Sequence, residues 1–145
     1  MKNSDSVMAP ERVFERLRAL CTERTVEGST VLFGQGETPK EVVLVLHGEI
    51  ALTPDATEPT LCRIASAGAV LGVPAILGRK CHSLTAVSVS KCMIAVVPRE
   101  RFLATLQTDP EMTLGIVRML AEEISEMQNL SVQFRLAHMT ELAIQ

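Results

Sequence analysis

The sequence predicts a mainly β fold, a sandwich or barrel of short strands, with flanking helices. Two observations carry this prediction. Between residues 25 and 97, short runs rich in Val, Ile, Leu and Thr alternate with Gly and Pro turns at nearly regular spacing. Before and after this region, apolar residues recur at three- and four-residue intervals, which is the spacing of one helical face.

The size and charge of the chain narrow the classes of protein to which it can belong. Its 145 residues suit one domain, and an apolar share of 47% with a charged share of 21% is enough for a core. A formal net charge of −3 leaves no basic stripe to neutralise nucleic-acid phosphates. No apolar run approaches the roughly 20 residues that span a bilayer, and the N-terminus is unlike a signal peptide. We therefore expect a single cytoplasmic domain over residues 1–145, with no membrane partner.

A first helix is expected over residues 10–21. Val13 and Leu17 lie on one helical face, and Pro10 suits the first turn of a helix. From Thr25 onward the pattern changes to β-branched pairs separated by Gly and Ser, which marks the start of the β region.

The β region is expected to hold six or more short strands between residues 25 and 97. The Val-rich run over 41–52 reads as one long strand with a bend or bulge at His47 and Gly48. Further strands are predicted at 61–64, 83–89 and 92–97.

Two helices are expected after the strands. Pro98 ends the β region, and residues 99–107 form a short helix with its apolar residues on one side. Asp109 and Pro110 then signal the start of a second, long helix over 110–138, because an acidic N-cap followed by proline is typical of a helix start.

The long helix carries a coiled-coil seam, in which residues recur at alternating three- and four-residue steps. The seam consists of Val117, Leu120, Ile124, Met127, Ser131 and Phe134. A helix of this length has more apolar surface than a small β domain covers, and a second copy offers the same seam. We expect a homodimer through this helix; packing of the helix on its own domain is the alternative.

Three segments of the β region match the motifs of one known family. VLFGQGE (31–37) is similar to its glycine turn, GAVLGVPAIL (68–77) to the entry of its phosphate cassette, and LTAV (84–87) to the sequence that closes the cassette. With the two flanking helices, the chain resembles the cyclic-nucleotide-binding effector domain of Crp/Fnr-type transcription regulators. The resemblance implies a double-stranded β-helix (a jelly roll, the cupin-like β-roll) followed by a dimerisation helix. It also implies an effector-sensing module that reaches DNA only through a domain absent from this chain.

The residues that hold a cyclic nucleotide in that family are replaced here. Its glutamate for the ribose hydroxyl corresponds to Val73, and its phosphate-binding arginine corresponds to Leu84. A charge-assisted phosphate contact contributes roughly 1.5–3 kcal/mol, so the loss of both groups should weaken cyclic-nucleotide binding by orders of magnitude. In the same loop, Arg79 and Lys80 either replace the arginine or are simply solvated.

The expected ligand site is therefore an apolar variant of the family's pocket, for a nucleotide-like or other small effector. A short helix after Gly72 would offer backbone N–H groups to an anion. On the long helix, the family's pair of hydroxyl residues corresponds to Met127 and Gln128, of which only Gln128 can hydrogen-bond a ligand. The candidate pocket residues are Leu71, Gly72, Val73, Pro74, Ala75, Ser83, Leu84, Thr85, Ala86 and Gln128.

Cys81 and His82 suggest a second hypothesis, a haem or redox sensor. A thiolate and an imidazole are ligands for haem iron, and some members of the superfamily carry haem. Against it, adjacent residues of one loop seldom both reach one metal, and an aromatic share of 3% offers little to sandwich a porphyrin. We expect Cys21, Cys62 and Cys92 to be small buried hydrophobes.

An enzyme is not expected, since the sequence has no Ser/His/Asp motif, P-loop or dinucleotide fingerprint. A cupin-like metal-dependent enzyme is the enzymatic alternative, because it shares the β-roll shape. It needs clustered histidines, whereas His47, His82 and His138 are isolated. A degenerate domain that serves only as a dimerisation scaffold, without a ligand, is the remaining alternative. No cofactor is certain.

Overall fold

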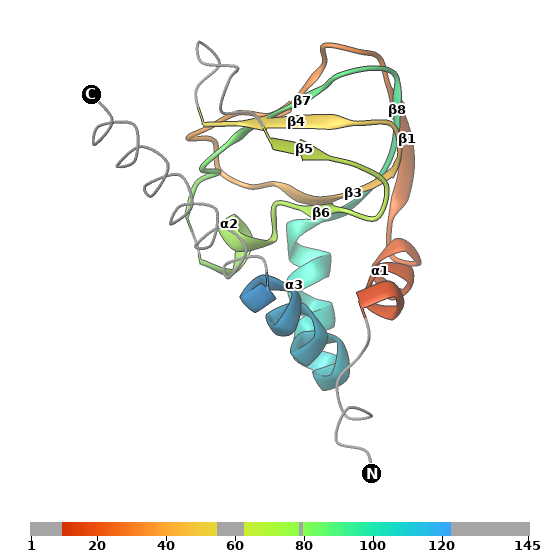
Figure 1. Ribbon diagram of the computed structural model, residues 1–145. Helices are drawn as coiled ribbons and strands as arrows, with labels where there is room; N and C mark the ends of the chain where they lie inside the picture. Colours follow the sequence, from red (N-terminus) through yellow and green to blue (C-terminus); the bar gives the residue numbers. More distant parts are fainter. Residues whose placement is uncertain (1–9, 55–62, 79, 123–145) are drawn as a thin grey trace, which may run out of the picture.

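The structure is a computed structural model that describes residues 10–54, 63–78 and 80–122 (Figure 1). Its strands are β1 (Thr22–Val26), β2 (Val31–Phe33), β3 (Glu41–His47), β4 (Ile50–Thr53), β5 (Arg63–Ala65), β6 (Val70–Leu71), β7 (Thr85–Ser88) and β8 (Cys92–Pro98). Its helices are α1 (Pro10–Arg18), α2 (Val73–Leu77) and α3 (Arg99–Thr108). After α3 the chain is again helical over 110–122, where the described residues end.

The described strands form two four-stranded antiparallel sheets, in the orders β1-β8-β3-β6 and β2-β7-β4-β5. From β1 to β4 each strand belongs to the sheet that the preceding strand does not, and β6, β7 and β8 alternate in the same way. Figure 1 shows the two sheets facing each other above a layer of helices. This arrangement confirms the predicted jelly roll with flanking helices.

The predicted long strand over 41–52 is wrong in one respect, because it is two strands in different sheets. β3 ends at His47 and β4 begins at Ile50, and Gly48 between them has a φ of +93°. A Cβ atom on Gly48 would lie 2.7 Å from the Sγ of Cys92 and 2.9 Å from the carbonyl oxygen of Lys91. Only glycine allows this close approach and this backbone conformation, so the chain turns a corner there.

Other element boundaries differ from the prediction by a few residues. α1 ends at Arg18 rather than at 21, and β1 begins at Thr22 rather than at Thr25. β1 is an edge strand whose first four residues are polar and exposed, so no alternation of apolar side chains marks its start. The predicted helix at 99–107 is confirmed as α3, and the predicted helix at 110–138 is confirmed over 110–122.

β3 is the centre of the core because both of its faces are buried. Val43 and Val45 point into the space between the two sheets, whereas Val42 and Leu44 point toward the helices. The residues that cover this outer face are Val13, Leu17, Phe102, Met112 and Ile116. Burial of an apolar side chain of this size contributes about 1.5–3 kcal/mol, so the helices are an integral part of the fold.

The start of the last helix is fixed by Asp109. Its Oδ1 accepts a hydrogen bond from the backbone N–H of Met112 at 3.1 Å, and its carboxylate forms an ion pair with Arg16 of α1. The hydroxyl of Thr113 donates to the carbonyl oxygen of Leu106 at 2.8 Å, which joins the helix to α3. The predicted N-cap is thereby confirmed, and the helix is held against its own domain from its first turn.

Of the predicted seam, Val117 and Leu120 lie within the described residues. Val117 is 53% exposed, whereas Leu120 packs against the helix-side core. The other seam positions, Ile124, Met127, Ser131 and Phe134, lie outside the described residues. Within the described part of the chain, no helix has the length and apolar character that a membrane span requires.

Candidate functional site

The segment from Gly68 to Ala86, which we call the cassette, connects the two sheets through β6, α2 and β7. Gly72, with a φ of +95°, ends β6 and leads directly into α2, which confirms the predicted short helix. A Cβ on Gly72 would lie 3.1 Å from the carbonyl oxygen of Glu41, so the cassette approaches β3 closely at this point. Pro74 in the first turn of α2 has no N–H, which removes one of the donors expected for an anion.

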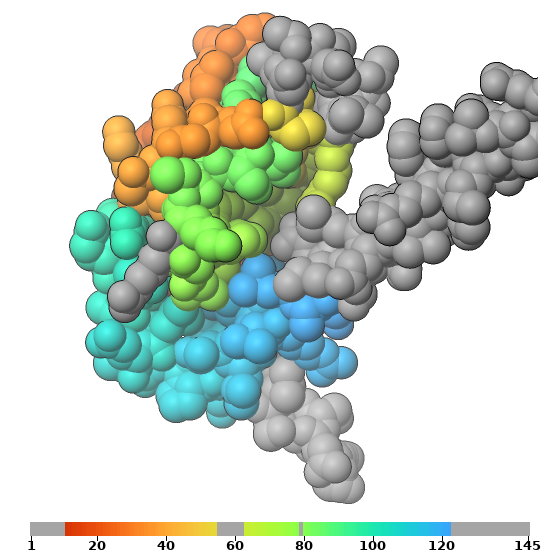
Figure 2. Space-filling model, turned by 90° about the vertical axis from the view of Figure 1, so that its left-hand side faces the viewer, coloured from red at the N-terminus to blue at the C-terminus, as the bar shows by residue number. Residues whose placement is uncertain are grey.

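A cavity of about 410 Å³ lies beside the cassette. Its lining residues are Phe33, Leu52, Arg63, Val70, Leu71, Gly72, Pro74, Ala75, Leu77, His82, Ser83, Leu84 and Leu120. The walls therefore come from the cassette, from the strands β2, β4 and β5, and from the 110–122 helix. Figure 2 shows the cassette, in green, between the orange strands and this helix, in blue.

The structure brings most of the predicted pocket residues to this cavity, but not all of them. Val73 is 4% exposed and belongs to the helix-side core. Ala86 is fully buried between the sheets, and the hydroxyl of Thr85 accepts a hydrogen bond from the backbone N–H of Gln35 at 2.9 Å. These three residues do not line the cavity, because the five-residue helix turns Val73 away and β7 enters the sheet at Thr85. Gln128 lies outside the described residues.

Two positions that correspond to ligand-binding residues of the family that the sequence resembles are apolar here. Val73 is buried in the core, and Leu84 lines the cavity half-buried. Lys80 is exposed and does not line the cavity, and Arg79 lies outside the described residues. Lys80 therefore does not take the place of the phosphate-binding arginine at this cavity.

Sequence reasoning missed Arg63, Phe33 and Leu120 as lining residues. Arg63 lies on β5, and Leu120 lies on the helix more than thirty residues after the cassette. No local motif marks either of them. They reach the cavity only because the jelly roll and the returning helix bring distant segments together.

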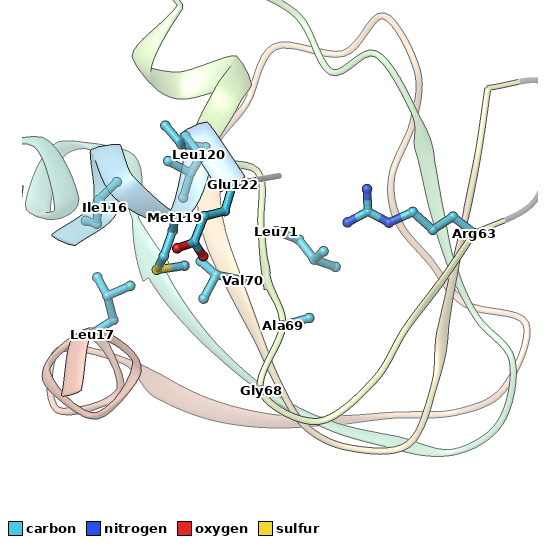
Figure 3. Close-up of a pocket in the computed structure, with 11 residues that line it drawn as sticks. Leu17, Arg63, Gly68, Ala69, Val70, Leu71, Ile116, Met119, Leu120 and Glu122 are labelled. Atoms are coloured by element: carbon cyan, nitrogen blue, oxygen red, sulfur yellow. The ribbon is translucent and has the colours of Figure 1, made fainter. Parts of the chain in front are cut away.

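A second cavity of about 350 Å³ is lined by β6 and by residues of the 110–122 helix (Figure 3). It shares Arg63, Val70, Leu71 and Leu120 with the first cavity. In Figure 3 the side chain of Arg63 extends from β5 toward Leu71, and the helix residues lie on the far side of Leu71. The two cavities are thus adjacent, since they share these four lining residues.

His82 anchors the wall of the first cavity on the side of β2. Its ring stacks on that of Phe33, with centroids 3.8 Å apart and an interplanar angle of 15°. Its backbone N–H donates to the carbonyl oxygen of Glu37 at 2.9 Å, and its carbonyl oxygen accepts from Gly36 at 2.8 Å. Burial lowers the pKa of His82, and the carboxylate of Glu37 opposes this shift, so the imidazole is neutral at pH 7.

The residues of the haem or redox hypothesis lie in different surroundings. Cys81 is exposed, whereas His82 is buried with one ring face against Phe33. Of the other cysteines, Cys92 is buried, as expected, and Cys21 is half-buried, with its thiol pKa raised to about 11 by burial. Cys62 lies outside the described residues. Among the residues described, no group of three or more His, Cys, Asp or Glu side chains could hold a metal ion.

Solved structures of bacterial regulators share this fold. The catabolite activator protein of Thermus thermophilus superposes with a TM-score of 0.69 at 21% identity, over 88% of this chain and 60% of that chain. The c-di-GMP responsive global regulator CLP of Xanthomonas campestris gives a TM-score of 0.65 at 16% identity, over 83% and 62%. A protein of a cyclic-GMP-dependent signalling pathway that regulates bacterial phytopathogenesis gives 0.65 at 20% identity, over 85% and 96%. The chain thus spans about three fifths of the length of the first two.

Sequence comparison identifies the family. A search of curated protein sequences gave no match. The family model described as the cyclic nucleotide-binding domain matches residues 23–109, which include both sheets, the cassette and α3. The chain belongs to the cyclic nucleotide-binding domain family.

Proposed function

We propose that this chain is a ligand-sensing regulatory module in which a small effector occupies the cavity beside the cassette. The proposal places it among binding modules rather than enzymes, in line with its family and with the regulators that share its fold. A helix-mediated homodimer and a role in transcription regulation are parts of the same proposal. The observation that carries it is the composition of the cavity wall.

That wall joins the cassette to the helix that follows the β-roll. Leu84 and Ala75 come from the cassette, and Leu120 comes from the 110–122 helix. Leu120 also packs against the helix-side core. A ligand that contacts Leu120 would therefore bind with different affinities to conformations that differ in the position of the helix. A ligand with such differential affinity shifts the population of helix positions, which is the basis of allosteric signalling.

The exposed face of the same helix supports the proposed dimer. Leu114 and Val117 are 51% and 53% exposed, although both are apolar. Exposed apolar residues one helical turn apart are typical of a helix that packs against another helix. A second copy of this chain offers the same face, so a two-fold contact would cover both.

Cyclic nucleotides are expected to be poor ligands of this module. The position of the ribose-binding acid holds the buried Val73, and the position of the phosphate-binding arginine holds Leu84. With no acid facing the cavity at the position of Val73, a ribose hydroxyl placed against Leu84 and the other apolar side chains of the wall would lose its hydrogen bonds with water and gain none. The cavity therefore selects against the family's usual ligand.

A thermal-shift screen tests the proposal. The panel contains cyclic AMP, cyclic GMP, AMP, ATP and small carboxylic acids, and the Tm of the purified chain is measured with each. We expect at least one compound to raise the Tm of the wild type. The variant Ser83→Trp, which fills the mouth of the cavity from an exposed position, should lose this shift.

The matched control is Ser90→Trp, because Ser90 is exposed and does not line the cavity. It should keep the ligand-induced shift in full. If no compound raises the Tm of the wild type, or if Ser83→Trp responds as the wild type does, the proposed ligand site is wrong. Only the first of these results, no Tm shift with any compound, would support a dimerisation scaffold without a ligand.

A further inference from the structure

We infer that the ligand of the cavity beside the cassette is an uncharged, mostly apolar molecule whose hydroxyl group hydrogen-bonds the imidazole of His82. This inference rests on the proposed function, because it assigns a chemical class to the ligand of the same cavity. It depends on three features of the site: the apolar lining, the open ring nitrogens of His82, and the charged groups beside that ring.

The lining of the cavity is mostly apolar. Its apolar side chains are those of Phe33, Leu52, Val70, Leu71, Pro74, Ala75, Leu77, Leu84 and Leu120. Such a surface favours a ligand whose body is hydrocarbon or aromatic, because every apolar atom that enters the cavity leaves water. The polar side chains are those of Arg63 and Ser83, which are exposed, and of His82, which is 6% exposed. Of the described lining residues, His82 therefore carries the buried polar side chain.

The ring nitrogens of His82 make no hydrogen bond with another described residue, although its backbone N–H and carbonyl oxygen both do. Across the described part of the chain, every fully buried side-chain nitrogen or oxygen has a hydrogen-bond partner. The ring nitrogens are therefore not sealed in the core but reach open space. Because His82 is buried and lines cavities, that space lies within them. A polar atom in such a place is satisfied by water or by a ligand.

The edge of the ring that carries the nitrogens faces Gly72. Its Cε1 atom, which is bonded to both nitrogens, would lie 3.6 Å from a Cβ atom on Gly72. Gly72 lines the same cavity and has no side chain that would cover this edge, whereas one face of the ring is stacked on Phe33. A neutral imidazole has one N–H donor and one acceptor nitrogen, and a hydroxyl group can pair with either of them.

The charges around the ring favour an uncharged group over an anion. Burial lowers the pKa of His82, so the imidazole is neutral at pH 7 and offers an anion no opposite charge. The carboxylate of Glu37 acts on the same ring and would repel an anion there. Phe33 and His82 also line a smaller cavity of about 140 Å³, in which the carboxylates of Glu37 and Glu41 outnumber the ammonium group of Lys40.

Together these features describe an apolar chamber with a neutral hydrogen-bonding side chain in its wall. A phenol or an alcohol with a hydrocarbon body complements it, since the body displaces water and the hydroxyl group replaces the water that would otherwise satisfy His82. A hydrocarbon of the same shape would displace that water without restoring its hydrogen bond. A carboxylate would bring a charge into the apolar lining.

The test measures the binding of three compounds with the same body, by isothermal titration calorimetry on the full chain at pH 7.5. The probes are 4-ethylphenol, ethylbenzene and 4-ethylbenzoate, which carry a hydroxyl group, a hydrogen atom and a carboxylate at one position. We expect 4-ethylphenol to bind the wild type about tenfold more tightly than either of the others. In NMR spectra, the chemical shifts of the His82 ring nitrogens should change on binding of 4-ethylphenol and much less on binding of ethylbenzene.

One variant locates the contact. His82→Phe keeps a ring against Phe33 but has no polar atom at its edge, so it should bind 4-ethylphenol and ethylbenzene about equally. His47→Gln is the matched control, because His47 is exposed and does not line the cavity. It should keep the tenfold preference of the wild type. The comparison of phenol with hydrocarbon in the wild type does not depend on any variant folding.

The outcomes separate this inference from the proposed function. Equal binding of 4-ethylphenol and ethylbenzene to the wild type, or an undiminished preference in His82→Phe, would overturn the role of His82 but leave a ligand site in the cavity. Tighter binding of 4-ethylbenzoate than of 4-ethylphenol would overturn the uncharged class of ligand. A failure of all three probes to bind would overturn the inference, whereas the thermal-shift screen and Ser83→Trp decide the proposed function separately.

Discussion

The rings of Phe33 and His82 stack at a centroid distance of 3.8 Å, and both residues line the cavity beside the cassette. Phe33 ends β2, and His82 lies in the loop between α2 and β7. Backbone hydrogen bonds from His82 to residues 36 and 37 hold the same two segments together. The stack therefore joins the loop between α2 and β7 to the end of β2.

Acid should weaken this link. The pKa of His82 lies below its ordinary value of 6.5 in the folded chain, so the unfolded chain binds a proton more readily. The free energy of unfolding should consequently fall as the pH drops below about 6.5 through the lowered pKa, and be unaffected by this group at higher pH.

The measurement is urea unfolding at pH 7.5 and at pH 5.5 for the wild type and for His82→Phe, which keeps an aromatic ring against Phe33. The variant should lose less stability than the wild type between the two values. His47→Gln, at an exposed position, is the control and should behave as the wild type does. Identical pH dependence of the wild type and His82→Phe would contradict the prediction.

The corner at Gly48 should be intolerant of any side chain. In Gly48→Ala the new methyl group meets the Sγ of Cys92 and the backbone of Lys91, in addition to the cost of a positive φ. We expect a loss of about 2–4 kcal/mol in the free energy of unfolding, since backbone strain of this kind costs of order 1–3 kcal/mol before any clash.

Gly36→Ala provides the matched comparison for the corner. Gly36 has a φ of +87°, but a Cβ there would meet no atom within 4 Å. Gly36→Ala should lower the free energy of unfolding by about 1 kcal/mol, which is the cost of a positive φ alone. Equal losses in the two variants, measured by chemical denaturation, would show that the close approach at Gly48 contributes nothing.

Restoring the family's arginine should restore part of its ligand preference. Leu84→Arg places a guanidinium on the cavity wall, where one charge-assisted phosphate contact is worth about a tenfold gain in the affinity for cyclic AMP. Leu84→Met, which keeps the wall apolar, should give no gain. The affinity of both variants for cyclic AMP is measured by calorimetric titration. An affinity of Leu84→Arg no higher than that of Leu84→Met would contradict the prediction.

The chain should dimerise through the exposed apolar face of the 110–122 helix, formed by Leu114 and Val117. We expect the chain to sediment as a dimer, and Val117→Asp to shift it toward monomer, because a charge would then lie within an apolar interface. Val117 is 53% exposed in the monomer, so its substitution should not unfold the domain. Ala104→Asp, on an exposed position of α3, is the control. A monomeric wild type in sedimentation equilibrium would rule out the dimer.

The body of the fold was predictable because its signals are local. Turn residues separate the strands, Asp109 marks a helix start, and Gly72 marks the entry to α2. The bend at His47 and Gly48 was predicted, but the separation of β3 and β4 into different sheets was not, since β3 is buried on both faces and its run of Val and Leu shows no alternation that would break at His47.

The ligand site was predictable only where it follows the cassette. Leu71, Pro74 and Leu84 line the cavity as expected, but a five-residue helix turns Val73 into the core. Arg63 carries no motif, and it lines the cavity together with Leu120, which lies more than fifty residues further along the chain. Such proximity follows from topology, which single-residue patterns do not encode.

The central claim is that a ligand in the cavity acts on the 110–122 helix. Hydrogen exchange, followed by mass spectrometry with and without the compound that raises the Tm most, tests it directly. The account predicts slower exchange in the cassette and in the helical segment that contains Leu120, with no such change in Ser83→Trp. Protection confined to segments outside the cavity wall, or a helix whose exchange is the same with and without the ligand, would contradict it.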